Sequence, residues 1–255
     1  MTTERELSPG LVVRGIVPPL RLADYRLIAF DMDSTLINIE CVDEIADAVG
    51  RKAEVAAITE AAMRGDITDF KDSLRRRVAL LAGAPLAALE AVERERLRLH
   101  PGAETLIAAC RAAGLYTLLV SGGFTYFSER VRERLGIDSA RANVLEVIDG
   151  RLSGRLLDQP WGDIVDGAMK RQTLLEACAR LGCTPAQAIA VGDGANDLPM
   201  MAAAGLGVAY HAKPKVRAAA QVTIDRGGLD RLLEVFARRA DDAPLRPRGS
   251  GAGQW

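Results

Sequence analysis

The sequence predicts an α/β fold in which a Rossmann-like parallel sheet is covered by helices on both faces. Short runs of β-prone apolar residues alternate along the chain with helical patterns. These runs are apolar throughout rather than alternating with polar residues, as expected for strands that are buried on both faces. The chain has 255 residues, of which 49% are hydrophobic, so it can form a full core and a smaller inserted unit.

The expected strands cover residues 27–30, 116–121, 188–191, 207–209 and, more weakly, 222–224. The helical patterns between them cover residues 103–113, 124–135, 170–181 and 197–204. Residues 143–159 depart from this alternation, and Asp149-Gly150 within them predicts the turn of a β-hairpin.

Three segments are expected outside the core that carries this alternation. Residues 38–100 are helical in pattern and predict a small helical cap inserted after the first strand, and Pro101-Gly102 marks the return to the core. The core then comprises residues 22–37 and 101–240. Residues 1–21 form an N-terminal extension, either packed on the core or disordered. Residues 241–255 are rich in Pro, Gly and Arg and predict a disordered tail.

Composition excludes several classes of partner. The net charge of −1 and the 4% aromatic content argue against nucleic acid and against an anionic membrane surface. No apolar stretch is long enough to span a bilayer, and the N-terminus lacks the pattern of a signal peptide. The four cysteines show no CxxC spacing and indicate a reducing, cytoplasmic location, with Cys41 interpreted as an ordinary helix residue. The oligomeric state is left open.

Two acids follow the first predicted strand directly. Asp31 and Asp33, with Ser34 and Thr35, form an oxygen-rich group of the kind that Mg²⁺ prefers, because buried carboxylates need a compensating cation. One carboxylate could attack phosphorus, and the other could act as general acid and base. The alternative is an Asx turn that caps the next helix.

Two further segments could bind a phosphate. Ser121-Gly122-Gly123 follows the strand at 116–121 and offers a hydroxyl and backbone amides to an anion, although a glycine-rich turn fits equally well. Lys170, near the start of a helix, could neutralise a phosphate or an aspartyl phosphate. It could also be a surface lysine, and its neighbour Arg171 is a rival candidate.

A last acidic segment, Gly192-Asp193-Gly194-Ala195-Asn196-Asp197, follows the strand at 188–191. Asp193 could complete a metal site, with Asn196 and Asp197 orienting waters or the phosphate. An Asp-Gly turn with Asn or Asp capping the next helix is the alternative. Because ligands of parallel sheets bind at the carboxyl ends of the strands, Asp31, Ser121 and Asp193 are expected to meet at one edge.

Together these segments resemble the successive motifs of the haloacid-dehalogenase (HAD)-type phosphatases, and most of all those of the phosphoserine phosphatase family, over residues 22–237. The resemblance implies a HAD-like core with Asp31 as nucleophile and Asp33 as general acid/base. It implies Mg²⁺ held by Asp31, the backbone carbonyl of Asp33 and Asp193. It further implies a phosphoryl site built from Ser121, Gly122, Lys170 and Asn196. Longer family members carry an additional N-terminal regulatory domain, for which residues 1–21 are too few.

The same resemblance extends into the helical cap. It implies that Glu40 binds the ammonium of the substrate, that Arg77 binds its carboxylate, and that Met63 and Phe70 line the pocket. A guanidinium suits a carboxylate geometrically. Without the resemblance, Glu40 is only a helix-terminal charge, Arg77 a solvated side chain, and Met63 and Phe70 core residues.

The predicted function is Mg²⁺-dependent hydrolysis of O-phospho-L-serine through an aspartyl phosphate, the last step of serine biosynthesis. The cap would act as a lid over this reaction. Alternatives are transfer of the phosphoryl group to another alcohol such as homoserine, and a phosphatase of other specificity. The presence of both Asp31 and Asp33 argues against a non-catalytic module that only binds a phosphorylated ligand.

Overall fold

The structure, a computed structural model, describes residues 4–64, 66–162 and 164–237. Nine strands of the described chain form one sheet in the order β1-β2-β9-β8-β7-β3-β4-β5-β6. The strands are β1 (Glu4–Ser8), β2 (Leu11–Arg14), β3 (Leu27–Phe30), β4 (Tyr116–Phe124), β5 (Ser139–Ile148), β6 (Arg151–Leu157), β7 (Ala188–Gly192), β8 (Leu206–Tyr210) and β9 (Val222–Ile224). The α-helices are α1 (Cys41–Ala48), α2 (Lys52–Arg64), α3 (Phe70–Ala79), α4 (Leu86–Glu95), α5 (Ala103–Ala112), α6 (Thr125–Leu135), α7 (Gly167–Leu181), α8 (Leu198–Ala203) and α9 (Pro214–Ala219).

The centre of the sheet is parallel, as predicted. Parallel pairing joins β9, β8, β7, β3, β4 and β5, and β3 lies between β7 and β4. Both edges are antiparallel, and of these the sequence pattern predicted only the hairpin of β5 and β6, not the edge formed by β1 and β2. At one edge β1 and β2 extend the sheet beyond β9, so the described part of the N-terminal extension packs on the core. At the other edge β6 turns back along β5 through the predicted hairpin at Asp149-Gly150.

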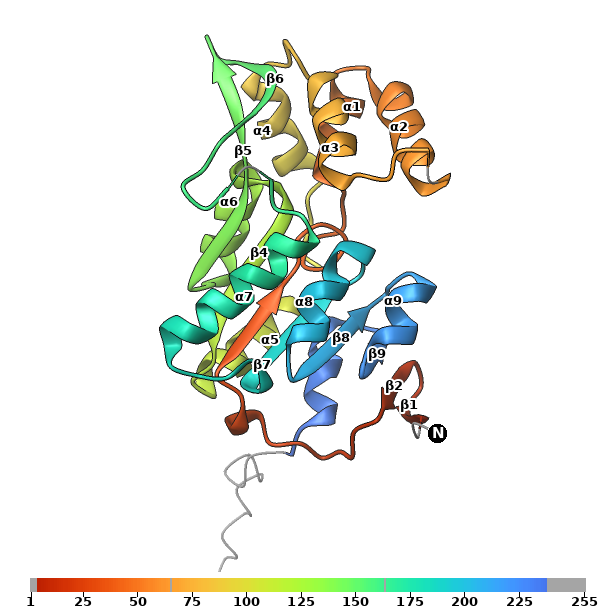
Figure 1. Cartoon of the computed structure of the whole chain (residues 1–255), viewed down its shortest axis with the longest axis vertical. Helices are drawn as coiled ribbons and strands as arrows, with labels where there is room; N and C mark the ends of the chain where they lie inside the picture. The colour runs from red at the N-terminus through yellow and green to blue at the C-terminus, as the bar shows by residue number, and fades with distance from the viewer. Residues whose placement is uncertain (1–3, 65, 163, 238–255) are drawn as a thin grey trace, which may run out of the picture.

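The two faces of the sheet are covered by different helices (Figure 1). Ile28 and Phe30 of β3 belong to a large cluster with buried residues of α5, α6 and the 3-10 helix η4 (Leu229–Val235). Leu27 and Ala29 point the other way and belong to a cluster with residues of α7, α8 and α9. Because neighbouring residues of a strand face opposite sides, a strand covered on both faces must be apolar throughout.

Residues at the helix ends determine where the helices that carry functional residues begin and end. Asp166 precedes α7, and its side chain accepts a hydrogen bond from the Met169 amide at 2.8 Å, as an N-cap residue does. Gly182, at φ 64°, ends the same helix in a left-handed conformation. The extended backbone of β4 continues to Phe124, so α6 begins at Thr125 and the predicted end of this strand at residue 121 was wrong.

Helices α1 to α4 lie together beyond the carboxyl ends of the central strands (Figure 1). Ile37 and Leu99 form an antiparallel bridge where the chain leaves and re-enters the core. The hairpin tip makes a second connection, because Gly83 donates to the Leu152 carbonyl and Leu152 donates to the Ala84 carbonyl, each at 2.8 Å. The limits of the cap at residues 38 and 100 remain a prediction.

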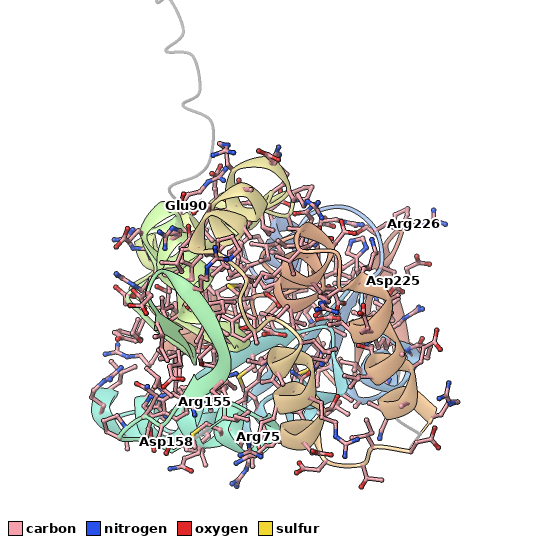
Figure 2. The ribbon with its side chains drawn as sticks, turned by 90° about the horizontal axis from the view of Figure 1, so that it is seen from above. Arg75, Glu90, Arg155, Asp158, Asp225 and Arg226 are labelled. Carbon is pink, nitrogen blue, oxygen red and sulfur yellow. The ribbon has the colours of Figure 1, made fainter. Side chains whose placement is uncertain are left out.

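Charged side chains of both signs point outward around the molecule, among them Glu90, Arg155 and Arg226 (Figure 2). This mixture agrees with the net charge of −1. Among the described residues, helices long and apolar enough to cross a membrane are absent. The predicted tail at 241–255 lies outside the described residues.

Candidate active site

A cavity of about 620 Å³ lies between the carboxyl ends of the central strands and the helical cap. The strand side of its lining includes Asp31, Asp33, Ser121, Gly122 and Asp193. The cap side includes Glu40, Phe70 and Arg77. The structure therefore brings together, around one cavity, residues that lie up to 162 positions apart in the sequence, from Asp31 to Asp193.

A buried ammonium group joins two carboxylates at the floor of the site. The Lys170 Nζ lies 2.7 Å from the Asp31 Oδ1 and 2.7 Å from the Asp197 Oδ1. Lys170 and Asp197 are fully buried, and Asp31 is almost so. Burial alone would lower the pKa of Lys170, but Asp197 and Asp31 hold it above its ordinary value. Lys170 is therefore a charged core residue, whereas its rival Arg171 is exposed.

Asp31 follows β3 and is fixed through its backbone. Its amide donates to the Val191 carbonyl at 3.0 Å, and its Oδ1 accepts from the Met32 amide at 2.7 Å. Burial and the neighbouring Asp197 raise the pKa of Asp31 well above its ordinary value, against the opposing charge of Lys170. The carboxylate is thus held in one place, and Lys170 is the cationic neighbour that favours its ionised form against this rise in pKa.

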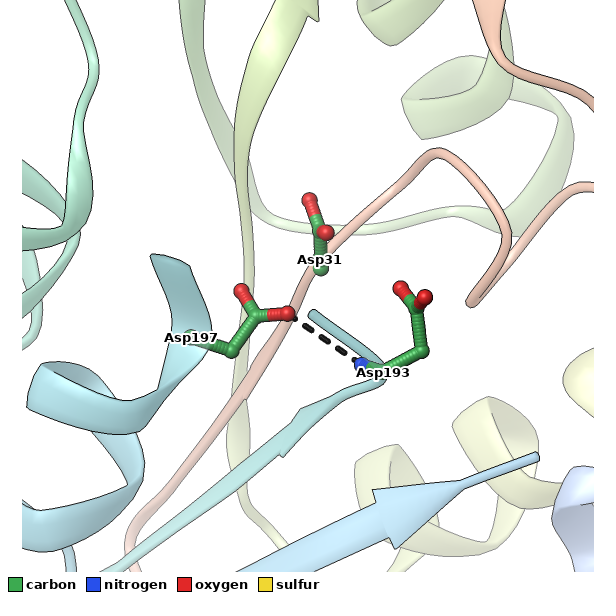
Figure 3. A group of neighbouring side chains, drawn as sticks. All are labelled: Asp31, Asp193 and Asp197. Atoms are coloured by element: carbon green, nitrogen blue, oxygen red, sulfur yellow. Dashed lines mark hydrogen bonds between the residues drawn. The ribbon is translucent and has the colours of Figure 1, made fainter. Parts of the chain in front are cut away.

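Three carboxylates could hold a metal ion. Oxygens of Asp31, Asp193 and Asp197 all lie within 4.8 Å of one another (Figure 3). Asp197 Oδ2 accepts from the Asp193 amide at 3.2 Å and from the Gly194 amide at 3.0 Å, which folds the second acidic segment, residues 192–197, around its own carboxylate. A Cβ at Gly192 would lie 2.3 Å from Asp197 Cγ, so this packing requires glycine.

The charges of this group fit a divalent cation. Burial, Asp197 and Glu40 raise the pKa of Asp193 to about 6, against the opposing charge of Lys213. Lys170 contacts the other two acids, Asp31 and Asp197. Hard oxygen ligands with excess negative charge suit Mg²⁺. Asp31 and Asp193 were predicted as metal ligands. Asp197, predicted only to orient waters or the phosphate, contributes the third carboxylate of the group.

The Asp33 side chain is held by the start of α1. Its Oδ2 accepts from the Cys41 amide at 3.0 Å, and its Oδ1 from the Cys41 thiol at 3.1 Å. Burial and the charge of Glu40 raise the pKa of Asp33 to about 7, which suits a group that gives and takes a proton at neutral pH. The interpretation of Cys41 as an ordinary helix residue was therefore wrong.

Ser121 and Gly122 lie in the last, extended part of β4, not at a helix terminus. The Ser121 Oγ accepts from the Gly123 amide at 2.9 Å. The Gly122 carbonyl accepts from the buried Asn143 side chain at 2.8 Å, and Asn143 Oδ1 accepts from the Val165 amide at 2.9 Å. Sequence reasoning missed Asn143, which fixes this strand end from β5.

Gly123 packs tightly beside Asp33. A Cβ at Gly123 would lie 3.0 Å from the Met32 Cε and 3.2 Å from the Asp33 Oδ2. A Cβ at Gly122 would lie 3.1 Å from the Phe70 Cζ, which shows that the first residue of α3 reaches across to β4. The cap and the core therefore touch at the phosphoryl side of the cavity.

The predicted recognition residues line the cap side more loosely. Glu40 precedes α1 and is exposed, and its Oε1 accepts from the Ser34 hydroxyl at 2.7 Å. The Arg77 Nε donates to the Ser73 carbonyl at 3.4 Å. Burial lowers the pKa of Arg77, against the charges of Asp43 and Glu40. The side chain of Met63 lies outside the described residues, so its predicted contact remains a prediction.

The cavity lining also includes residues that were not predicted, among them Lys213 and Asp43. Lys213 precedes α9, and its amide donates to the Asp193 carbonyl at 3.2 Å. Asp43 lies in the first turn of α1. The predicted residue Asn196 also lines the cavity, whereas Lys170 lies beneath its surface and contacts it through Asp31.

Comparisons with known proteins agree with this geometry. Residues 25–205 match the family model of the haloacid dehalogenase-like hydrolases. A phosphoserine phosphatase of Polaromonas sp. is 68% identical over 230 residues, which are 90% of this chain and 98% of the relative. The unliganded crystal structure of a probable phosphoserine phosphatase from Vibrio cholerae has a TM-score of 0.76 at 44% identity and covers 88% of this chain and 68% of that one.

A substrate-bound phosphoserine phosphatase complex matches with a TM-score of 0.76 at 37% identity, over 84% of this chain and 99% of that one. The family-model match covers most of the core, and the Polaromonas relative is matched over nearly its whole length. The chain belongs to the haloacid dehalogenase-like hydrolases and, within them, to the phosphoserine phosphatase family.

Proposed function

We propose that the chain hydrolyses O-phospho-L-serine to L-serine and phosphate through a phosphoryl group carried by Asp31, with Mg²⁺ as cofactor. One observation carries the proposal. The buried Asp31–Lys170–Asp197 group opens onto a cavity whose opposite side presents a carboxylate and a guanidinium, Glu40 and Arg77. The 68% identity to a phosphoserine phosphatase over nearly its whole length supports the same substrate.

The proposed chemistry has two steps. The Asp31 carboxylate attacks phosphorus while the seryl oxygen leaves and takes the proton of Asp33. Asp33 then takes a proton from water, whose oxygen attacks the same phosphorus and releases Asp31. The raised pKa of Asp33, about 7, supports both roles because the group is neither fully charged nor fully neutral near pH 7.

The phosphoryl group is proposed to lie between β4, α7 and the second acidic segment. Ser121, Gly122 and Asn196 line the cavity there, and Lys170 contacts the attacking carboxylate at 2.7 Å. The metal ligands are proposed to be Asp31, Asp193 and the backbone carbonyl of Asp33. The Asp197 carboxylate lies next to those of Asp31 and Asp193. When bound, the cation would offset the negative charge of the phosphoryl oxygens.

Recognition of the amino acid is assigned to the cap. Glu40 is proposed to bind the ammonium, Arg77 the carboxylate, and Phe70 and Met63 to cover the ester. The contact of Phe70 with Gly122 supports a cap, residues 38–100, that closes over the phosphoryl site as a lid. Four free cysteines support the proposed cytoplasmic location.

A panel of phosphomonoesters, measured with Mg²⁺ and with a chelator, tests this function. We expect phosphoserine to give the highest kcat/KM and the chelator to abolish turnover. A panel led by another ester would contradict the assigned substrate. Added alcohols such as homoserine distinguish hydrolysis from transfer, since transfer would yield a new phosphoester at the expense of free phosphate.

A further inference from the structure

An unassigned acid lies beside the predicted carboxylate site. Asp43 lines the same cavity as Arg77 and Glu40, from the first turn of α1. Its Oδ1 is buried and has no hydrogen-bond donor among the described residues. A buried carboxylate oxygen without a donor is costly, so its position calls for a partner.

Arg77 is the matching group on α3. Within the described chain it forms no ion pair, and its Nε donates to the Ser73 carbonyl at 3.4 Å. A guanidinium has five N–H donors, so most of them remain for other acceptors in the cavity. α1 and α3 thus present an acceptor and several donors to one space.

The two groups are also each other's strongest charged neighbour. Apart from burial, Arg77 has the largest influence on the pKa of Asp43, and Asp43 has the largest influence on the pKa of Arg77. Glu40 influences Arg77 less. Asp43 is therefore better placed to act on the guanidinium, while the exposed Glu40 is free to receive an ammonium.

We propose that Asp43 is a positioning residue for substrate recognition: its carboxylate orients the Arg77 guanidinium, so that the remaining donors meet the carboxylate of the amino-acid phosphoester. This inference rests on the proposed function. Asp43 itself does not touch the substrate in this scheme. Its effect should therefore depend on a carboxylate in the substrate and on the presence of Arg77.

The experiment compares Asp43→Asn with the wild-type chain on phosphoserine and on phosphoethanolamine, which has the same ammonium and ester but no carboxylate. We expect KM for phosphoserine to rise about tenfold, as for one lost hydrogen bond to a charged group, with kcat within about twofold. KM for phosphoethanolamine should stay within about twofold. In an Arg77→Ala background, Asp43→Asn should add little.

Asp47→Asn is the matched control, because Asp47 lies on the same helix but pairs with Arg96 outside the cavity. It should leave both KM values unchanged. Asp43→Ser serves as a second variant if Asp43→Asn fails to fold. Equal KM increases for the two esters, or full additivity with Arg77→Ala, would overturn the inference alone. A wild-type chain that does not prefer phosphoserine would overturn the proposed function as well.

Discussion

The two sides of the cavity are built differently. On the strand side, Lys170 contacts Asp31 and Asp197 at 2.7 Å, and all three are buried. On the cap side, Glu40 is exposed and Asp43 keeps a buried oxygen without a donor. The buried groups of the strand side are held by direct contacts with one another, whereas the cap side leaves donors and acceptors open.

This difference follows from what each side is proposed to do. Groups that stabilise a transition state work best when they are fixed before the substrate arrives. Groups that recognise an ammonium and a carboxylate must keep hydrogen-bonding capacity for them. Changes on the strand side should therefore reduce kcat or stability, and changes on the cap side should mainly raise KM.

Asp31→Asn is the strongest test of the strand side. The neutral amide cannot attack phosphorus, so kcat should fall by about 10⁴-fold or more, as expected when a nucleophile is removed. The fold should persist, because the amide oxygen can still accept from Lys170. Turnover should be measured with circular dichroism as the check on folding. Ordinary turnover in a folded Asp31→Asn chain would contradict the assigned nucleophile.

Lys170→Met tests whether the buried charges support the fold. Removal of the ammonium leaves two buried carboxylates uncompensated, and breaking a buried pair typically costs about 3–5 kcal/mol. The free energy of unfolding, measured by urea denaturation, should fall by that amount. Lys215→Met on the exposed part of α9 is the control and should change it little. Equal effects of the two variants would contradict the structural role of Lys170.

The pattern of the sequence was sufficient for the centre of the fold. Residues 27–30 and 222–224 form strands with the predicted limits, because uniformly apolar segments between turn residues have few alternatives. β1 was not predicted, since Glu4 to Ser8 are mostly polar and are exposed or half-buried at a sheet edge. Such a strand is stabilised by pairing with β2, which no local pattern reveals.

Prediction of the site from local sequence patterns has the same limit. Asp31, Asp33 and Asp193 could be found because each follows a predicted strand, and strand ends meet at one edge. Asn143 and Cys41 could not be found in this way, since their importance lies in hydrogen bonds to Gly122 and Asp33. Those contacts depend on packing between distant segments. Asn143 is a buried polar residue in the middle of β5, and its burial becomes evident only in the folded chain.

The pH dependence of stability gives a third test of the strand side. Burial raises the pKa of Asp33 to about 7 and that of Asp193 to about 6, above the value near 3.9 of an unfolded chain. The folded state therefore binds more protons between about pH 4 and pH 7, and the free energy of unfolding should fall as the pH rises through this range. Asp33 is half-buried, so screening by solvent reduces its contribution to the change in the free energy of unfolding.

The measurement is urea denaturation from pH 4 to pH 8 in a chelator. In the double variant Asp33→Asn, Asp193→Asn, the free energy of unfolding should fall less steeply with rising pH. Saturating Mg²⁺ should also make this fall less steep in the wild-type chain, because the cation favours the ionised acids. Asp47→Asn should leave the slope above pH 5 unchanged, since Arg96 lowers the pKa of Asp47. A wild-type slope of the opposite sign would contradict the proposed compensation by a cation.

Arg77→Ala tests the cap side and should have the smallest effect. Loss of the guanidinium removes the partner of the substrate carboxylate, so KM for phosphoserine should rise about tenfold to a hundredfold, the range of one or two charge-assisted hydrogen bonds. KM for phosphoethanolamine should change by less than about twofold, and kcat should be nearly constant for both. Steady-state kinetics with the two esters provides the measurement.

Arg76→Ala is the matched control, because Arg76 is the exposed neighbour of Arg77 and pairs with Asp72 on the same helix. It should leave both KM values unchanged. A loss of kcat in Arg77→Ala as large as the rise in KM would mean that the cap side also organises the reacting groups. The contrast between a strand side fixed for chemistry and a cap side kept open for recognition would then not hold, because Arg77 would act on both.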